Sequence, residues 1–454
     1  MHVGDMNRRS PAVAALLSFL WPGAGHWYLG RRITALVFAI PLLLVTVLLL
    51  LKVLLGGIEG FAFWAITPSG AFTLFLLAVV SGTWRLIAIT DATLAGRRQA
   101  NGLDNPTSGL AAFLIALMVM THGGVGWVAY AGYDASSHIF TPGNGDDTTP
   151  TANPSESDVV EEPSGSPEPS PSPTTKLTSG RLTFLLVGID SAPGRSETLT
   201  DTIMLVSVLP STGAVAMVSL PRDISRFPLY NGGVYTSKIN SLMVYATSHP
   251  SKFPEGGLDA LAAEVGFIVG VPVDYYAAVN LGGFRTLIDT AGGVTVDNPK
   301  VIIDPQYEWL DGTFGFRLSA GVHTLNGRDA LAFARSRLGV GDSDFTRANR
   351  QQILLLALRD KLTSPDNLPK IPSLLQVAGQ TIRTNLPPEM LQQLVDLARN
   401  VDKSAVQQIV LGPPYSVHPP SNLTGGTYIL QIDPVALTAL SVKLFGTDSR
   451  YYTP

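Results

Sequence analysis

The sequence predicts an α/β domain in which a mixed β-sheet is sandwiched between helices, preceded by transmembrane α-helices and a disordered stalk. Three observations lead to this prediction. Apolar residues are concentrated before residue 133, and residues 141–180 are rich in Pro, Ser, Thr, Asp and Glu. From residue 181 onward, short apolar runs typical of strands alternate with amphipathic helical patterns.

The composition of the chain excludes several classes of function. The chain has 454 residues, of which 46% are apolar and 15% charged, and it contains no cysteine. The lack of cysteine rules out disulfides, thiolate metal sites and a cysteine nucleophile. A formal net charge of −4 gives no global attraction for nucleic acid, so no nucleic-acid partner is expected.

Residues 1–133 are interpreted as a multi-span membrane anchor. Each predicted span offers roughly the 20 apolar residues that cross a bilayer. The spans are expected at about 33–55, 70–93 and 108–131. The first apolar stretch lacks a small-residue cleavage site, so no cleavable signal peptide is expected.

Segment 11–29 is predicted to form a re-entrant or interfacial hairpin. It is apolar, but Trp21-Pro22-Gly23-Ala24-Gly25 interrupts it. Arginines flank the segment on both sides, and the positive-inside rule keeps both flanks in the cytoplasm. By the same rule Arg97 and Arg98 are cytoplasmic, and the C-terminal domain after the third span is extracytoplasmic, which makes the chain a multi-pass protein of the cell membrane.

Residues 134–180 are interpreted as an extracytoplasmic linker. Their Pro/Ser/Thr-rich composition cannot bury a core and stays disordered or extended. A spacer next to a membrane suits a domain that reaches into a cell wall, and a plain interdomain linker is equally compatible.

The globular part is divided into a catalytic domain at 181–363 and a C-terminal extension at 364–454 that packs on it. TIMLVSVLP and AVAMVSLPRD read as strands of a hairpin, and FTRANRQQILLLALRDKL reads as a helix with Asp344 as its N-cap. The extension is expected to hold a helix near 387–400, a strand near 405–411 and a helix near 433–446.

Charged residues of this domain stand where strands and helices end. Asp190 closes the first strand, Asp201 precedes the second, and Arg222 follows the third. Two carboxylates suit a hard cation such as Mg²⁺, and guanidinium groups donate paired hydrogen bonds to phosphate. Together they indicate a metal–pyrophosphate site, although helix caps and solvated ion pairs are the simpler alternative for the same residues.

Seven motifs in one order resemble the LytR-CpsA-Psr family. They are Gly188-Ile189-Asp190, Leu199 to Met204, Ser219 to Asp223, Ser237 to Asn240, Phe284 to Val296, Leu325 to Arg337, and Asp344 to Gln352. In that family an extracytoplasmic domain transfers glycans from a polyprenyl-pyrophosphate carrier to peptidoglycan. The resemblance covers about 181–363, and the loop after Asn240 and the multi-span anchor depart from the usual pattern.

The resemblance also implies residue roles. Asp190 and Asp201 are similar to acids that bind Mg²⁺, with Mn²⁺ as the alternative, and with three arginines they form the implied catalytic set: Arg222, Arg335 and Arg337. The implied contacts to the pyrophosphate head group are these arginines together with Lys238, Asp344, Arg347 and Gln351. Asp344 and Arg347 match the Asp-Phe-x-Arg pattern of the family, and Asp223 is expected to orient Arg222.

The predicted function is a Mg²⁺-dependent phosphotransferase that moves a glycan polymer from polyprenyl pyrophosphate to peptidoglycan in cell wall assembly. The expected partners are the lipid-linked glycan, the peptidoglycan acceptor and the lipid bilayer. Two alternatives stay open: a pyrophosphatase that uses water at the same site, and a non-enzymatic membrane-bound regulator of envelope genes. No helix-turn-helix or basic patch is evident for a regulator.

Overall fold

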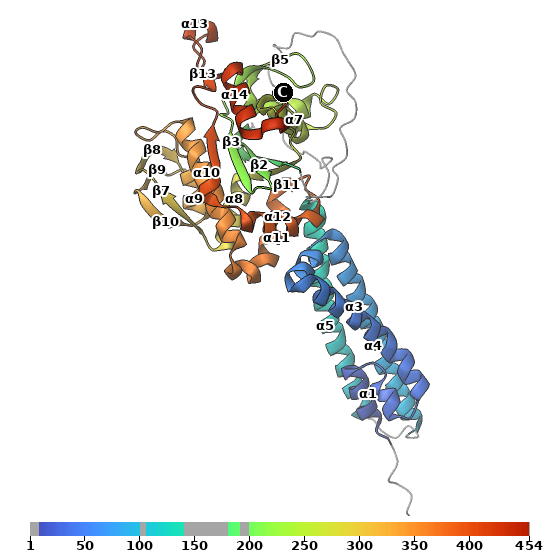
Figure 1. The fold of residues 1–454 in the computed structure, drawn as a ribbon. Helices are drawn as coiled ribbons and strands as arrows, with labels where there is room; N and C mark the ends of the chain where they lie inside the picture. The colour runs from blue at the N-terminus through green and yellow to red at the C-terminus, as the bar shows by residue number, and fades with distance from the viewer. Residues whose placement is uncertain (1–8, 100–105, 140–179, 191–198, 454) are drawn as a thin grey trace, which may run out of the picture. The chain divides into compact units, whose positions relative to one another are not determined.

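The computed structural model describes residues 9–99, 106–139, 180–190 and 199–453. Contacts divide the chain into two compact units, Met1–Ser136 and Ser137–Pro454 (Figure 1). The linker predicted at 134–180 lies almost wholly outside the described residues. Its first residues are an exception, because they continue the last long helix of the first unit to Ile139.

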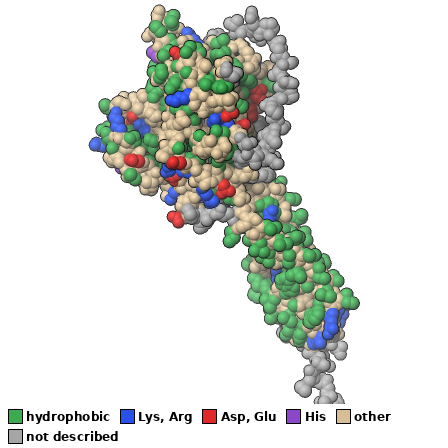
Figure 2. Space-filling view, viewed as in Figure 1, with side chains coloured by type: hydrophobic (Ala, Val, Ile, Leu, Met, Phe, Trp, Pro, Cys, Tyr) green, Lys and Arg blue, Asp and Glu red, His purple; other side chains and the backbone are tan. Residues whose placement is uncertain are grey.

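The first unit is helical and carries the predicted spans. Its helices are α1 (Pro11–Leu20), α2 (Ala24–Tyr28), α3 (Arg32–Ala65), α4 (Pro68–Gln99) and α5 (Pro106–Ile139). Three segments are long and apolar enough to cross a membrane: Arg32–Ile58, Pro68–Arg98 and Gly109–Asp134. Large apolar side chains such as Leu54 and Trp127 are exposed on this unit. Figure 2 shows hydrophobic side chains over much of its visible surface. The three predicted helices are confirmed, and each is longer than predicted.

Segment 11–29 forms two short helices joined by a turn, as the interruption at residues 21–25 predicts. Gly23 lies in the turn at φ 93°, and a Cβ there would lie 2.2 Å from the carbonyl oxygen of Ala35. Glycine is therefore required by both the backbone conformation and the close approach of α3. Helix α1 packs along α4, where Gly96 leaves room for Pro11.

The second unit is built on a six-stranded mixed sheet with the order β11-β6-β1-β2-β3-β12. The strands are β1 (Leu182–Asp190), β2 (Leu199–Leu209), β3 (Ala214–Ser219), β6 (Tyr275–Asn280), β11 (Ile382–Thr384) and β12 (Gln407–Val410). β1 pairs parallel to β6, β3 pairs parallel to β12, and the other pairs are antiparallel. The predicted hairpin of β2 and β3 is confirmed.

Helices cover both faces of this sheet, which confirms the predicted fold class (Figure 1). On one face, residues such as Leu185 and Ile203 pack against α6 (Leu242–Ser248), α7 (Gly257–Val269) and α14 (Pro434–Phe445). On the other face, Met204 and Met217 lie in a cluster with apolar residues of α10 (Asp344–Thr363) and α12 (Leu391–Asn400).

A smaller lobe lies between β6 and α10 in the sequence and has a core of its own. Its elements are α8 (Leu281–Ala291), β7 (Val294–Asn298), β8 (Ile302–Glu308), β9 (Phe314–Leu318), β10 (Gly321–Leu325) and α9 (Gly327–Arg335). β7 pairs with β10 and β8 pairs with β9, around buried residues such as Val296 and Phe333. The short elements elsewhere are β4 (Ser225–Pro228), β5 (Val234–Lys238), α11 (Ile371–Thr381), β13 (Ser416–Val417), α13 (Ser421–Thr424) and β14 (Gln431–Ile432).

Two predictions about this unit are wrong. The chain after residue 363 is not an extension packed on a finished domain, because β11 and β12 form both edges of the central sheet. The N-cap of α10 is Ser343 rather than Asp344. Ser343 and Thr346 form a reciprocal capping box, which leaves the carboxylate of Asp344 to pair with arginines. The helices and the strand predicted after residue 386 are confirmed as α12, β12 and α14.

Candidate active site

A β-bulge brings the two predicted metal ligands to one side of the sheet. Gly188 of β1 pairs with Thr202, but the next residue, Ile189, pairs with Thr200, so Asp201 is an extra residue in β2. Asp201 therefore lies within β2 rather than before it, and alternation alone would point it toward the core face of Ile203. The bulge instead lets Asp201 and Thr202 line the same pocket as Asp190.

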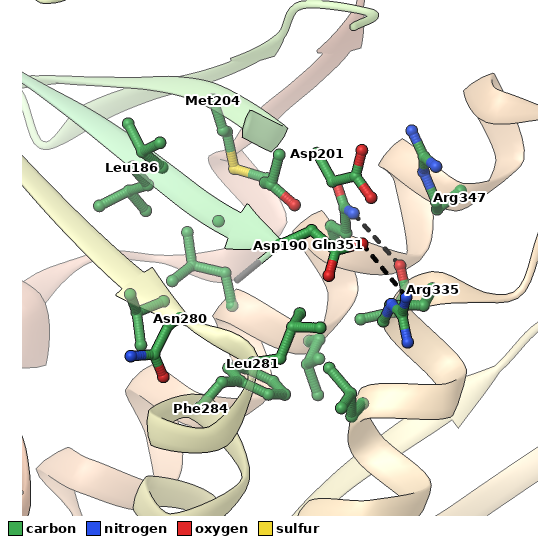
Figure 3. Close-up of a pocket in the computed structure, with 18 of the residues that line it drawn as sticks. Leu186, Asp190, Asp201, Met204, Asn280, Leu281, Phe284, Arg335, Arg347 and Gln351 are labelled. Carbon is green, nitrogen blue, oxygen red and sulfur yellow. Dashed lines mark hydrogen bonds and ion pairs between the residues drawn. The ribbon is translucent and has the colours of Figure 1, made fainter. Parts of the chain in front are cut away.

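This pocket, which we call the reaction pocket, has a volume of about 450 Å³ and two chemically different ends. Figure 3 shows Leu186, Met204, Leu281 and Phe284 on one side and the charged residues on the other. The apolar walls come from β1, β2, α8 and α10. The polar end contains seven of the predicted site residues: Asp190, Asp201, Arg222, Arg335, Arg337, Arg347 and Gln351.

Arg222 is fixed by carboxylates on several sides. Its Nη1 donates to Oδ1 of Asp201 at 2.7 Å, and its Nε lies 3.9 Å from Asp223 and 4.0 Å from Asp344. Burial alone lowers the pKa of Arg222, but the neighbouring carboxylates outweigh burial and raise it above the ordinary value. The arginine is therefore permanently charged and held with its fork at the pocket wall.

Arg335 and Arg337 are presented by a segment that Asp304 of β8 holds in place. The buried Asp304 carboxylate accepts hydrogen bonds from Ser336 Oγ at 2.7 Å and from the N–H groups of Arg337 and Leu338 at 3.1 Å. Arg335 in turn lies 3.4 Å from Oδ2 of Asp190. Sequence analysis missed Asp304, because β8 (IIDPQYE) also contains Gln306 and Glu308 and its local pattern does not distinguish this acid.

The start of α10 adds a third group of charges. Asp344 Oδ1 lies 3.0 Å from Nη2 of Arg347 and 3.6 Å from Nη1 of Arg337. Burial lowers the pKa of Arg347, and Asp344 opposes that shift. Gln351, one turn further along, donates to the carbonyl oxygen of Ala334, which ties α10 to the end of α9. Asp344 is thus a neighbour of the pocket through its arginines rather than part of its wall.

Lys238, like Asp344, is a predicted head-group contact that the structure places apart from the pocket wall. It pairs with the buried carboxylate of Asp223, which also faces Arg222. Lys238 therefore reaches the site only through this chain of charges. Its direct contact with a head group stays a prediction.

The carboxylates fit a magnesium site of one particular kind. Within the described ranges, no group of three or more His, Asp or Glu side chains is placed to enclose a metal ion. Asp190 and Asp201 offer two carboxylates that open onto one pocket beside arginines. Mg²⁺ is commonly bound through one or two carboxylates, several waters and substrate phosphates, so these two residues suit an ion that arrives with a phosphate ligand.

Comparison with known proteins identifies relatives of this second unit. The profile of the LytR_cpsA_psr family matches residues 149–444, more than half of the chain. The Bacillus subtilis polyisoprenyl-teichoic acid–peptidoglycan teichoic acid transferase TagU is 27% identical over 263 residues, covering 58% of this chain and 76% of TagU. The B. subtilis transferase TagV is 31% identical over 274 residues, 60% of each chain. The crystal structure of B. subtilis TagV aligns with a TM-score of 0.48 and 24% identity, covering 61% of this chain and 100% of that one.

Proposed function

The chain belongs to the LytR-CpsA-Psr family, and we propose that it transfers a glycan polymer from a polyprenyl-pyrophosphate carrier to peptidoglycan during cell wall assembly. The names of TagU and TagV describe transfer of teichoic acid to peptidoglycan by those proteins.

The observation that carries the proposal is the division of the reaction pocket. An apolar wall runs into a cluster of four arginines and three aspartates within one cavity. A lipid pyrophosphate has this same division, with a hydrocarbon tail joined to a doubly charged head. Arginines bind phosphate oxygens through paired hydrogen bonds, and burial of the tail strengthens these contacts by excluding water.

Each group at the polar end has a distinct task in this proposal. Arg222, Arg335 and Arg337 hold the pyrophosphate oxygens and stabilise the charge that develops on them during transfer. Asp190 and Asp201 would hold Mg²⁺, with Mn²⁺ as the alternative, and the bound ion would supply positive charge to the phosphate oxygens. Asp304 holds the Arg335–Arg337 segment in position through its hydrogen bonds.

The reaction is a displacement at the phosphorus atom next to the glycan. A hydroxyl oxygen of peptidoglycan forms a new bond to that phosphorus, and the bond from phosphorus to the bridging oxygen breaks. Polyprenyl phosphate leaves, and the proton of the hydroxyl passes to a carboxylate at the polar end of the pocket. Positioning and charge stabilisation supply most of the rate enhancement in such phosphoryl chemistry.

A transfer assay tests this function. The full chain in detergent is supplied with a lipid-linked glycan, Mg²⁺ and peptidoglycan fragments, and both products are followed. We expect a glycan–phosphate–peptidoglycan product together with polyprenyl phosphate, lost on chelation and restored by Mg²⁺. Release of polyprenyl phosphate at an equal rate without any acceptor would favour the pyrophosphatase instead, and no turnover under either condition would contradict both enzymes.

A further inference from the structure

A second cavity lies beside the reaction pocket, and none of the groups that perform the proposed reaction lines it. It has a volume of about 250 Å³. Its lining residues are Arg285, Tyr307, Trp309, Leu310, Asp311, Arg328 and Leu331. Tyr307 and Leu331 also line the reaction pocket, so the two cavities share a wall.

The aromatic side of this second cavity is held rigidly. Trp309 donates its indole N–H to the carbonyl oxygen of Gly315 at 2.8 Å, and Tyr307 packs edge-on against it at 5.0 Å between ring centres. The guanidinium of Arg328 lies 4.1 Å from the Trp309 ring centre and 3.2 Å from Asp311. The cavity therefore has a preformed wall, which is typical of small-molecule sites.

The cationic side of the cavity is not fully neutralised. Arg285 and Arg328 face it, and only Asp311 among its lining residues carries negative charge. Nε of Arg285 is buried and has no hydrogen-bond partner among the residues that the structure describes. Because the protein encloses Nε, a ligand would reach Arg285 at its terminal nitrogens, where an anionic group would compensate the charge of the guanidinium.

The shared wall connects the second cavity to the reacting groups. Burial raises the pKa of the Tyr307 hydroxyl, and the charges of Arg335, Arg285 and Arg328 oppose that rise. Tyr307 thus lies within the electrostatic reach of Arg335 in the reaction pocket and of both arginines in the second cavity. A ligand in the second cavity would stand next to the pyrophosphate site.

We propose that the second cavity binds an anionic sugar unit of one of the two glycans, with the sugar ring against the aromatic wall and its carboxylate or phosphate on Arg285 and Arg328. The inference rests on the proposed function for the identity of the substrates. The same chemistry can come from the glycan on the lipid carrier or from the peptidoglycan acceptor, and the experiment separates these two sources.

A binding experiment on the full chain reports on the cavity directly. Trp309 is the only tryptophan after residue 136, so the fluorescence difference between wild type and Trp309→Phe isolates its signal. N-acetylmuramic acid and N-acetylglucosamine 1-phosphate serve as anionic probes, and N-acetylglucosamine as the neutral one. We expect the anionic probes to change this signal. Arg285→Ala should weaken the affinity for these probes about tenfold or more, as loss of a hydrogen bond to a charged group does.

Matched variants keep this test specific. Arg317 is exposed and lines neither cavity, so Arg317→Ala should bind the probes as wild type does. Arg285→Lys retains the charge and should weaken binding less than Arg285→Ala, which keeps the test usable if the alanine variant folds poorly. Equal binding of neutral and anionic probes, or unchanged binding by both Arg285 variants, would overturn the proposal.

The transfer assay then identifies the source of the sugar. Arg285→Ala should raise the KM of the donor if the cavity holds the carrier glycan, or the KM of the acceptor if it holds peptidoglycan, by about tenfold in either case. An unchanged KM for both substrates would overturn the inference even if the probes bind. Failure of transfer in the wild-type chain would contradict the proposed function alone, because the fluorescence result does not depend on turnover.

Discussion

Individual residues at the polar end of the reaction pocket act through the shape of their side chains as well as their charge. We expect Arg335→Ala to lower transfer roughly 30-fold or more, because removing one partner of a desolvated charge pair costs about 2–5 kcal/mol. Arg335→Lys should fail as well, since an ammonium group cannot make the planar fork. Initial rates with the lipid-linked donor measure the effect, and the thermal melt should stay nearly unchanged.

The control for this substitution must be an arginine whose side chain does not hold elements of the fold together. Arg359 of α10 does not meet this condition. Its guanidinium donates to the carbonyl oxygens of Ala398 and Val401 at 2.6 Å and so ties α10 to the end of α12. Arg317→Ala is the better control and should keep wild-type rates. Wild-type rates in a folded Arg335→Ala protein would contradict the assignment of Arg335.

Glu264 gives a pH-dependent stability that is separate from catalysis. It is 0% exposed in α7, where Oε2 accepts a hydrogen bond from the N–H of Tyr230 at 3.1 Å. Burial raises its pKa to about 8, and Arg450 opposes the shift only in part. An acid whose folded pKa is raised contributes stability that is fully present below its unfolded pKa and is lost as pH rises through the folded pKa.

We therefore expect the free energy of unfolding of residues 180–454 to fall by a few kcal/mol between pH 5 and pH 8 from this group. The glutamine side chain of the Glu264→Gln variant cannot ionise, so the free energy of unfolding of this variant should change less over the same pH range. Urea unfolding of both proteins at each pH measures the difference. Parallel pH curves for the two proteins would show that Glu264 does not carry this dependence.

At the scale of elements, the pairing of β1 and β2 decides where the acids point. A Cβ at Gly188 would lie 2.9 Å from both Cβ and Oγ1 of Thr202, so Gly188→Ala must push the two strands apart beside the bulge. We expect a loss of about 1–3 kcal/mol in the free energy of unfolding, typical of overpacking, together with reduced transfer as Asp201 moves. Denaturant unfolding and the transfer assay measure the two effects.

A second glycine separates this effect from glycine replacement in general. Gly282 in α8 has only the Asn280 side chain near its missing Cβ, at 3.6 Å. Gly282→Ala should therefore be neutral or stabilising, because alanine favours a helix over glycine. Adding Thr202→Gly to Gly188→Ala should recover part of the lost activity. No recovery, with Gly188→Ala as stable as wild type, would mean that the contact does not set the position of Asp201.

Patterns along the chain predicted the long elements, but not the contacts that complete the site. Apolar runs and helical periodicity are local signals, so the β2–β3 hairpin, α10 and the three long apolar helices were all found. The bulge at Asp201 depends on the register with β1, and the hold of Asp304 on the Arg335–Arg337 segment joins residues about 30 positions apart. Neither leaves a signal in the local sequence.

The same limit explains the misplaced domain boundary. β11 contains three residues, too few for periodicity to mark it, and β12 was predicted as a strand but not as an edge of the central sheet. Both are fixed by their pairing with β6 and β3, which lie more than a hundred positions earlier in the chain. The boundary was predicted at 363 because the resemblance to the family ends there. The two edge strands of the sheet, however, come from the residues that follow.

For the whole molecule, the arrangement of the apolar helices predicts on which side of the membrane the second unit lies. Helix α1 has 10 residues, which at about 1.5 Å per residue is about half of a bilayer core of roughly 30 Å. Segment 11–29 is then a hairpin, and three candidate spans remain. An odd number of spans places the two ends of the chain on opposite sides of the membrane.

The arginines fix the direction of this topology. Arg31 precedes α3 and Arg32 begins it, and Arg97 and Arg98 lie in the last turn of α4, so both positions should be cytoplasmic by the positive-inside rule. Reporter fusions after residue 140 should therefore signal the outside, and fusions near residues 3 and 98 the inside. A fusion near residue 3 that signals the outside, with the other two as expected, would make segment 11–29 a fourth span. An inside signal after residue 140 would place the second unit in the cytoplasm, where no peptidoglycan could reach its pocket, and would contradict the proposed function as well as the topology.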